Sequence, residues 1–274
     1  RRLFDRTTAF VAGLLLASGL MFAVLARAAT PDAVLMICTT SAFYFFVVGI
    51  SSLRGGQFSP RLGEVAPSLR THRLPLKPAA AMYAAMGLAL LAKGPIGLLL
   101  PALVIASYAI FFSEASGIEA QDFGSGRLRS WLNFFRRSLA PRRVWQLALG
   151  VRALQGAAIA AAVAGPWYVA VSIATEGEWL AGFIGTHNVH RFMHPMEGHS
   201  GPIFYYVLAI LAGFFPGSCF LPVAVVHASV DARRRAAAAH SQAFLLCWAG
   251  CYLVVFSAAA TKLPNYVAPC YPAL

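Results

Sequence analysis

Residues 79–113 read AAAMYAAMGLALLAKGPIGLLLPALVIASYAIFFS, an apolar stretch interrupted once, at Lys93-Gly94-Pro95. As one helix, these 35 residues would be about 52 Å long. About 20 residues are enough to cross ~30 Å of hydrocarbon. Adjacent Gly and Pro are typical of a tight reversal. The stretch therefore predicts two membrane spans, 79–92 and 96–113, joined by a short turn.

Five more apolar stretches of this kind occupy the rest of the chain. Hydrophobic residues make up 59% of the sequence and charged residues 12%, whereas a soluble domain has about half apolar and a quarter charged residues. We expect an all-α fold, a polytopic transmembrane helical bundle with about seven spans within residues 1–274. The five further spans lie at about 7–26, 33–53, 153–174, 203–230 and 241–260.

The distribution of Lys and Arg supports this division. With seven spans, 18 of the 22 basic residues fall in loops on one side of the membrane. Basic residues concentrate on the cytoplasmic side of membrane proteins, so this side is expected to be cytoplasmic. Only four basic residues lie on the other side: Arg27, Lys93, Arg191 and Lys262. Because the cations are dispersed over several loops, the net charge of +12 favours contact with membrane lipids and no nucleic-acid partner.

The loop 114–152 carries seven of these arginines. Within it, residues 128–139 have an apolar and a basic face on a helical wheel, which is typical of a helix lying on an anionic leaflet. The apolar face consists of Leu128, Trp131, Leu132, Phe135 and Leu139. We therefore interpret 114–152 as a basic cytoplasmic loop with an amphipathic interfacial helix, the alternative for 128–139 being an ordinary solvated loop.

Four polar segments are expected on the opposite, outer side, and the first two are short. Asp32 follows Thr30-Pro31, a favourable helix start, and a carboxylate there stabilises the positive end of a helix. The alternative to this structural role is that the Asp32 carboxylate faces a substrate. Lys93 in the turn 92–97 either extends to lipid headgroups or contacts a phosphate or carbonyl.

The third segment, 175–201, is expected to be a periplasmic loop. It contains most of the titratable side chains predicted on the outer side. Arg191 lies among His187, His190, His194 and His199. Three interpretations remain open: an anion site in which Arg191 binds a phosphate, a zinc or other divalent metal site, and an interfacial loop with a structural role. The metal site would draw on the four histidines and Glu197, with His187 and His190 as its first candidates.

The fourth segment, 261–272, reads TKLPNYVAPCYP. Its prolines exclude an undisturbed helix, and Lys262 and Tyr266 lie four residues apart at the membrane edge. Anchoring at the interface is one explanation for this pair. The prolines favour a rigid, shaped segment.

The interior of the predicted spans contains no Asp, Glu, Lys or Arg. Ion-coupled transporters usually carry ionisable groups near the middle of the membrane. The pattern therefore favours an enzyme that acts at the outer face over two alternatives, a transporter or flippase for a lipid-linked substrate and a non-catalytic assembly protein.

Five short motifs occur in order from about Thr30 to Leu274 and resemble those of the GT-C membrane glycosyltransferases. The likeness is greatest to the aminoarabinose (lipid A) transferase branch, which is related to the protein O-mannosyltransferases. The motifs are Thr30-Pro-Asp32, Leu91-Ala-Lys-Gly-Pro-Ile-Gly-Leu-Leu-Leu-Pro101, Gly165-Pro-Trp-Tyr168, Asn188-Val-His-Arg-Phe192 with Gly201-Pro-Ile-Phe-Tyr-Tyr206, and Thr261-Lys-Leu-Pro-Asn-Tyr-Val-Ala-Pro269.

The resemblance implies an integral enzyme of the bacterial inner membrane that acts at its periplasmic face. Such an enzyme transfers a sugar from a polyprenyl-phosphate carrier, with inversion, to a lipid or protein acceptor such as lipid A. In this chain Arg191 matches the arginine that binds the carrier phosphate, and Tyr266 with Lys262 matches the motif that completes that site. Asp32 matches an aspartate lining the outer cavity, and His187 or Asn188 matches a metal-binding position of some relatives.

One part of the family pattern is expected N-terminal to Arg1. The first outer loop of the family, with its acidic pair, has no counterpart in residues 1–274. The resemblance therefore implies that the general base lies outside this chain and that the chain alone is inactive.

Overall fold

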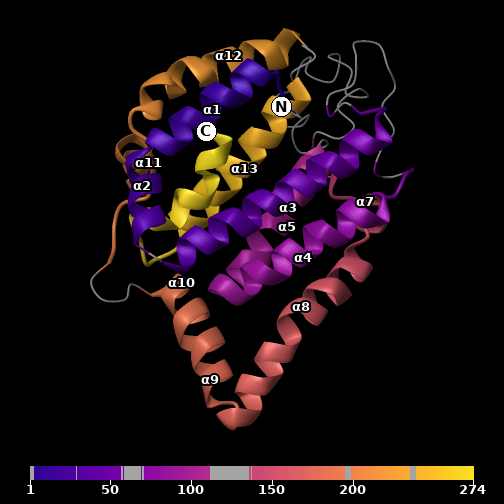
Figure 1. Ribbon diagram of the computed structural model, residues 1–274, viewed down its shortest axis with the longest axis vertical. Coiled ribbons are helices and arrows are strands. Elements are labelled where there is room, and N and C mark those ends of the chain that lie inside the picture. Colours follow the sequence, from indigo (N-terminus) through magenta and orange to yellow (C-terminus); the bar gives the residue numbers. More distant parts are fainter. Residues whose placement is uncertain are drawn as a thin grey trace.

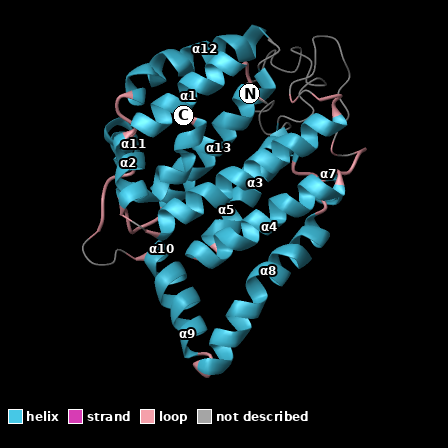
Figure 2. Cartoon of the chain, in the orientation of Figure 1, coloured by secondary structure: helices cyan, strands magenta, loops and turns pink. Residues whose placement is uncertain are grey.

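The computed structural model describes residues 3–28, 30–56, 58, 69, 71–111, 136, 138–194, 199–234 and 239–274. In these residues the chain forms helices and connecting loops, without strands (Figure 2). Within the described residues, every stretch predicted as a span is mostly helical. The helices are α1 (Arg6–Ser18), α2 (Leu20–Arg27), α3 (Pro31–Leu53), α4 (Leu76–Lys93), α5 (Ile96–Phe111), α7 (Pro141–Gly150), α8 (Ala153–Ala174), α9 (Glu178–Ala181), α10 (Arg191–Met193), α11 (Tyr205–Gly213), α12 (Leu221–Arg234) and α13 (Ala239–Ala258). A π-helix, η3 (Gly182–His190), and two 3₁₀ helices, η4 (Gly217–Phe220) and η5 (Pro264–Ala273), complete the order.

The all-α membrane fold is confirmed, although fewer helices than expected are straight spans. Among the described residues, three helices are individually long and apolar enough to cross a membrane, α3, α8 and α13, or five if each of two bent pairs counts as one span. The helix α4 carries Lys77 and Lys93 near its ends, and α5 has only 16 residues.

The two bent pairs correct the expectation of unbroken spans at 7–26 and 203–230. α1 and α2 meet at 64°, where Gly19 adopts an extended conformation, and α11 and the helical segment from Gly217 meet at 114°. The second break follows from Gly213, Pro216 and Gly217, because proline lacks the N–H that a continuous helix needs. The breaks contact each other, since Leu20 N–H donates to the Phe215 carbonyl at 3.2 Å.

The reversal predicted at Lys93-Gly94-Pro95 is present, and α4 and α5 pack as a hairpin. Gly94 adopts φ +79°, a conformation that side chains disfavour. The two helices approach closely at Gly97, where an added Cβ would lie 2.2 Å from the Ala89 carbonyl oxygen. The prediction of two helices joined by a turn, instead of one kinked helix, is therefore confirmed, while neither α4 nor α5 is by itself long and apolar enough to count as a span.

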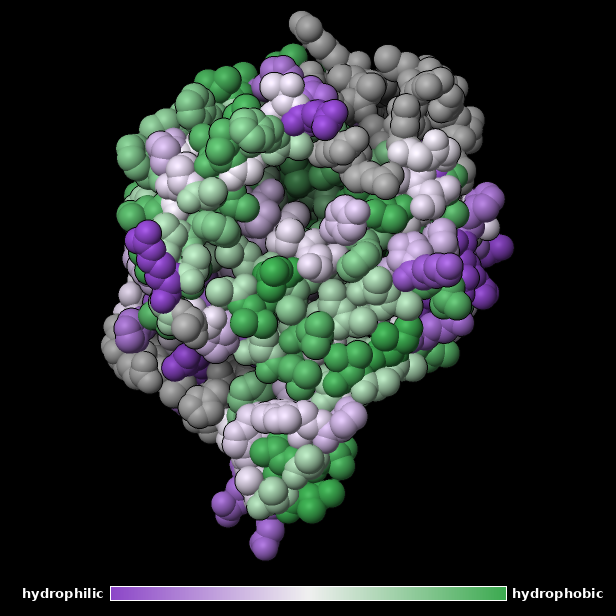
Figure 3. Space-filling view, viewed as in Figure 1, coloured by the Kyte–Doolittle hydropathy of each residue, from purple (hydrophilic) through white to green (hydrophobic). Residues whose placement is uncertain are grey.

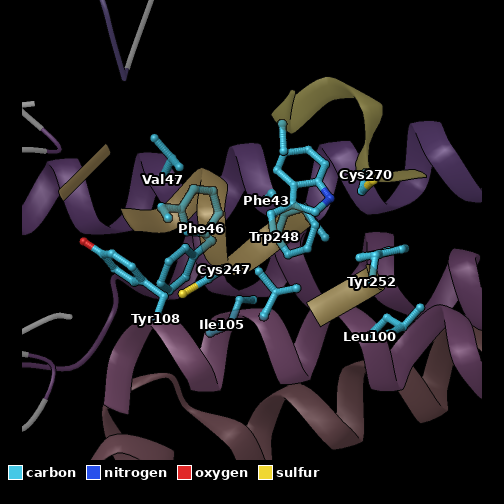
Figure 4. Close-up of a cluster of buried hydrophobic side chains, with 14 of the residues drawn as sticks. Phe43, Phe46, Val47, Leu100, Ile105, Tyr108, Cys247, Trp248, Tyr252 and Cys270 are labelled. Atoms are coloured by element: carbon cyan, nitrogen blue, oxygen red, sulfur yellow. The ribbon is translucent and has the colours of Figure 1, made fainter. Parts of the chain in front are cut away.

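Aromatic side chains of α3, α5 and α13 form the centre of the bundle (Figure 4). The Phe43 ring lies 4.3 Å from that of Trp248, and Phe244 packs against both Phe46 and Tyr108 at 5.7 and 5.4 Å. The Trp248 indole donates to the Pro269 carbonyl at 3.0 Å, which fastens η5 to α13. This proline-rich segment is thus buried in the core, as expected for a rigid element.

The helices run between two ends of the bundle, which we call the basic end and the site end (Figure 1). At the basic end, Arg152 and Arg143 donate to the carbonyls of Leu74 and Ile110, and Ser241 donates to that of Leu3. At the site end lie the starts of α3 and η5, the end of α4, and α10. The connection between α4 and α5 lies at the site end and that between α7 and α8 at the basic end (Figure 1).

The predicted amphipathic helix at 128–139 lies almost wholly outside the described residues. The loop 114–152 instead provides α7, a described helix that begins at Pro141.

We expect Gly97→Ala to lower the thermal stability of the full-length protein in detergent, because its methyl group would overlap the Ala89 backbone. Overpacking of this kind costs about 1–3 kcal/mol. The matched control is Gly13→Ala in α1, whose Cβ would meet nothing within 4 Å. Equal unfolding midpoints for the two variants would contradict the close packing of α4 and α5.

Candidate functional site

Residues from each of the four polar segments that the sequence predicts on one side come together at the site end. Asp32 begins α3, Lys93 ends α4, Arg191 begins α10 and Tyr266 lies in η5. These residues are separated by up to 234 positions in the chain, yet a continuous series of contacts joins them. We call them, together with Asn265, the polar cluster.

Asp32 is the most buried member of the polar cluster, with 5% of its surface exposed. Its Oδ1 accepts a charge-assisted hydrogen bond from Lys93 Nζ, and its Oδ2 accepts one from Asn265 Nδ2 at 2.7 Å. It also lies in the first turn of α3, where the helix dipole favours a carboxylate. Both oxygens are engaged, so in this arrangement Asp32 holds Lys93 and Asn265 in place.

Lys93 links this carboxylate to the aromatic side of the cluster. Its Nζ lies 4.7 Å from the centroid of the Tyr266 ring, within the range of a cation–π interaction. Its side chain is 23% exposed.

Tyr266 joins Lys93 to Arg191. Its hydroxyl accepts a hydrogen bond from Arg191 Nη1 at 3.3 Å. Its ring packs against Phe256 of α13, with centroids 5.2 Å apart, and is 9% exposed. The phenol is therefore fixed by the core, with its hydroxyl directed toward the arginine.

The segment that carries Arg191 is tied to the link between α13 and η5. Ala260 N–H donates to the Phe192 carbonyl at 2.8 Å, and Lys262 N–H donates to the His199 carbonyl at 2.9 Å. The Thr261 hydroxyl donates to the His194 carbonyl at 3.0 Å. These three bonds set the position of α10 against η5, and with it the contact between Arg191 and Tyr266.

Lys262, which the sequence analysis grouped with Tyr266, does not contact the polar cluster through its ammonium group. Its Nζ donates to the carbonyls of Ser257 and Ala259 at 2.8 and 2.9 Å, at the C-terminal end of α13. A cation there satisfies carbonyls that a helix end leaves without partners. Burial lowers the pKa of this ammonium from its ordinary value. The structure thus places Lys262 as a helix cap beside the Tyr206 ring, not within the polar cluster.

The histidines of this segment face outward where they are described. The rings of His190 and His194 lie 4.8 Å apart, and both side chains are exposed. The side chains of His187 and Glu197 lie outside the described residues. Within the described part of the chain no three metal-ligating side chains come together.

Sequence reasoning missed Asn265. It lies in the quoted motif between Pro264 and Tyr266, and the only available signal was an amide next to the tyrosine on a proline-rich segment. Its role depends on Asp32, 233 positions away, and no local pattern could indicate that contact.

The polar cluster has the composition of an anion site. Two cations, Lys93 and Arg191, flank a phenol, and the one carboxylate is buried behind Lys93. A phosphate has oxygens that accept strong hydrogen bonds from ammonium and guanidinium groups. The arrangement is suited to a phosphate ligand near Arg191 and Tyr266.

Two kinds of sequence comparison, with family models and with individual proteins, both find sugar transferases that resemble this chain. Residues 1–59 match the family model of dolichyl-phosphate-mannose-protein mannosyltransferases. An undecaprenyl phosphate-alpha-4-amino-4-deoxy-L-arabinose arabinosyl transferase of Erwinia tasmaniensis is 32% identical over 144 residues, which are 50% of this chain and 24% of the relative. A transferase of the same name from Aeromonas salmonicida is 29% identical over 204 residues, 73% of this chain and 31% of the relative.

The fold has a counterpart among solved structures. The crystal structure of ArnT from Cupriavidus metallidurans bound to undecaprenyl phosphate superposes with a TM-score of 0.61 at 23% identity, over 96% of this chain and 38% of that one. Its apo state gives 0.59 at 24% identity. The expected resemblance to the GT-C branch is therefore confirmed, for a chain that spans about a quarter to two fifths of these proteins.

We expect Asp32→Asn and Lys93→Met each to destabilise the full-length protein, because each leaves a charge without its partner. Removing one partner of a fully buried ion pair lowers the free energy of unfolding by about 3–5 kcal/mol. We expect a smaller decrease here because the Lys93 side chain is 23% exposed. The double variant should be more stable than either single one. Thermal unfolding in detergent measures this, with Lys77→Met, at an exposed lysine of the same helix, as control. If the double variant lost as much stability as the two single variants together, the ion pair would be contradicted.

Proposed function

We propose that this chain is the carrier-binding part of a membrane glycosyltransferase that takes its sugar from a polyprenyl phosphate. The observation that carries the proposal is the contact series Asp32–Lys93–Tyr266–Arg191 at one end of a helical bundle. The likeness to undecaprenyl-phosphate-dependent arabinosyl transferases supports the choice of carrier. The acceptor is proposed to be a lipid or protein at the same membrane face, such as lipid A.

Arg191 and Tyr266 are proposed to bind the carrier phosphate directly. Arg191 presents a planar set of N–H donors that can engage two phosphate oxygens at once. The Tyr266 hydroxyl accepts from Arg191 and can donate its own proton to a phosphate oxygen. Lys93, held 4.7 Å from the Tyr266 ring centroid, adds a second positive charge beside the phenol.

In the proposed reaction, an acceptor hydroxyl attacks the anomeric carbon of the sugar from the side opposite the phosphate. The bond between that carbon and the phosphate oxygen breaks, its electron pair goes to the phosphate, and the configuration inverts. The hydroxyl proton goes to a general base. Negative charge grows on the departing phosphate, so cations directed at it stabilise the transition state.

Asp32 is proposed to act as a positioning residue. Its two oxygens are engaged by Lys93 and Asn265, so its contribution is the placement of those side chains. Lys262 is proposed to support the site indirectly, because it caps α13 and its backbone binds the segment that follows Arg191.

The proposed orientation places the basic end in the cytoplasm and the site end, with residues 175–201, in the periplasm of a bacterial inner membrane. Exposed arginine and lysine side chains at the basic end favour this orientation by the positive-inside rule. A transporter or flippase for the same lipid is the second candidate, since it would also bind the carrier phosphate. Sugar transfer by the full-length protein separates the two.

We expect Arg191→Ala to lower kcat/KM for sugar transfer by roughly 10- to 200-fold, the worth of one charge-assisted hydrogen bond of about 1.5–3 kcal/mol. Tyr266→Phe removes only the hydroxyl and should have a smaller effect in the same direction. The control is Arg6→Ala, an exposed arginine at the basic end, which should stay within about twofold of wild type. Equal losses for Arg191→Ala and Arg6→Ala would mean that the proposed phosphate site is wrong.

A further inference from the structure

The helix α7 lies on the surface of the basic end and exposes apolar and basic side chains together. Trp145 is 66% exposed and Leu149 40%, and both lie on one face of the helix with the exposed Arg142. Leu147 and Gly150 are buried on another face. An amphipathic helix of this kind has one side packed on the protein and the other directed away from it.

Two contacts hold α7 firmly against the membrane-spanning helices. Arg143 donates to the Ile110 carbonyl near the end of α5, at 3.2 Å. The Gly150 carbonyl accepts from Leu74 N–H at 2.8 Å, directly before α4. The orientation of the exposed face is therefore fixed by the bundle.

The start of α4 extends this face. Leu76 is 56% exposed, and Arg73 and Lys77 beside it are exposed as well. Hydrophilic side chains gather at the edge of the molecule where α7 and the start of α4 lie, on the right in Figure 3. We call Arg73, Leu76, Lys77, Arg142, Trp145 and Leu149 the α7 surface.

The sequence around the α7 surface carries positive charge without acidic residues. Neither 65–113 nor 123–175 contains an Asp or Glu. A partner must therefore be anionic, and it must also accept an exposed indole and leucine. Lipid headgroups at a bilayer interface meet both requirements, because tryptophan favours this depth and arginine binds lipid phosphate.

We infer that the α7 surface is a binding site for anionic phospholipid headgroups, in which Arg142, Arg73 and Lys77 contact phosphate and Trp145 and Leu149 enter the interface. The surface adjoins the start of α4, the end of α5 and the start of α8, which the charge pattern predicts to lie at the cytoplasmic interface. This inference is independent of sugar transfer and of the polar cluster at the other end of the bundle.

Native mass spectrometry of the full-length protein, in detergent with equal amounts of phosphatidylglycerol and phosphatidylcholine, tests the inference. Wild type should retain phosphatidylglycerol preferentially. Arg142→Gln should lower its retention about fivefold, as expected for one basic residue at an anionic surface. Arg73→Gln combined with Arg142→Gln should lower it further, and Trp145→Ser should also reduce it.

Matched controls come from the site end. Arg27→Gln replaces an exposed arginine there, and Trp167→Ser replaces an exposed tryptophan. Both should leave phosphatidylglycerol retention within about twofold of wild type. All positions changed at the α7 surface are exposed, and gel filtration checks that each variant stays monodisperse.

Three outcomes would overturn the inference. They are equal retention of the two lipids by wild type, a loss with Arg27→Gln as large as with Arg142→Gln, and displacement of the bound lipid by an acidic peptide or an oligonucleotide.

Discussion

The ion pair between Asp32 and Lys93 is the contact on which the geometry of the candidate site depends. A carboxylate that is 5% exposed needs a charged or hydrogen-bonding partner on each oxygen, because an unpaired buried charge is strongly unfavourable. Asp32 meets this need with Lys93 from α4 and Asn265 from η5, so one side chain fixes three elements. Tyr266 follows Asn265 directly, and its ring lies beside Lys93 and its hydroxyl beside Arg191.

The aromatic core holds η5, and with it Asn265 and Tyr266, in position. Trp248 binds the Pro269 carbonyl and Phe256 packs on Tyr266, so η5 cannot shift without disturbing α13. The polar cluster is in this sense preorganised: its cations and phenol are held before any ligand binds. Preorganised charge is what a site needs if it is to stabilise a departing phosphate. At the opposite end, α7 is fixed to the bundle through Arg143 and the Gly150 carbonyl, and its Arg142 stays exposed.

Much of this could be predicted from residue types and their spacing. The reversal at Gly94-Pro95, the helices and the alternation of loops follow from apolar length and charge, and Asp32, Lys93, Arg191 and Tyr266 were named because polar groups are rare in this chain. The breaks at Gly19 and Phe215 were missed, although Pro216 and its neighbouring glycines were a local signal for the second one. The position of Lys262 was also missed, because a lysine near a tyrosine in sequence gives no indication that α13 ends within its reach. Asn265 acts through a partner that only the folded chain brings near.

The central claim is that the site end recognises a lipid phosphate. The most direct test compares the binding of undecaprenyl phosphate and of the neutral alcohol undecaprenol to the full-length protein in detergent, for wild type and for the double variant Arg191→Gln, Tyr266→Phe. Wild type should bind the phosphate at least tenfold more tightly than the alcohol, corresponding to about 1.4 kcal/mol or more, and the double variant should lose most of that difference. Equal affinity of wild type for the phosphate and the alcohol would contradict the account.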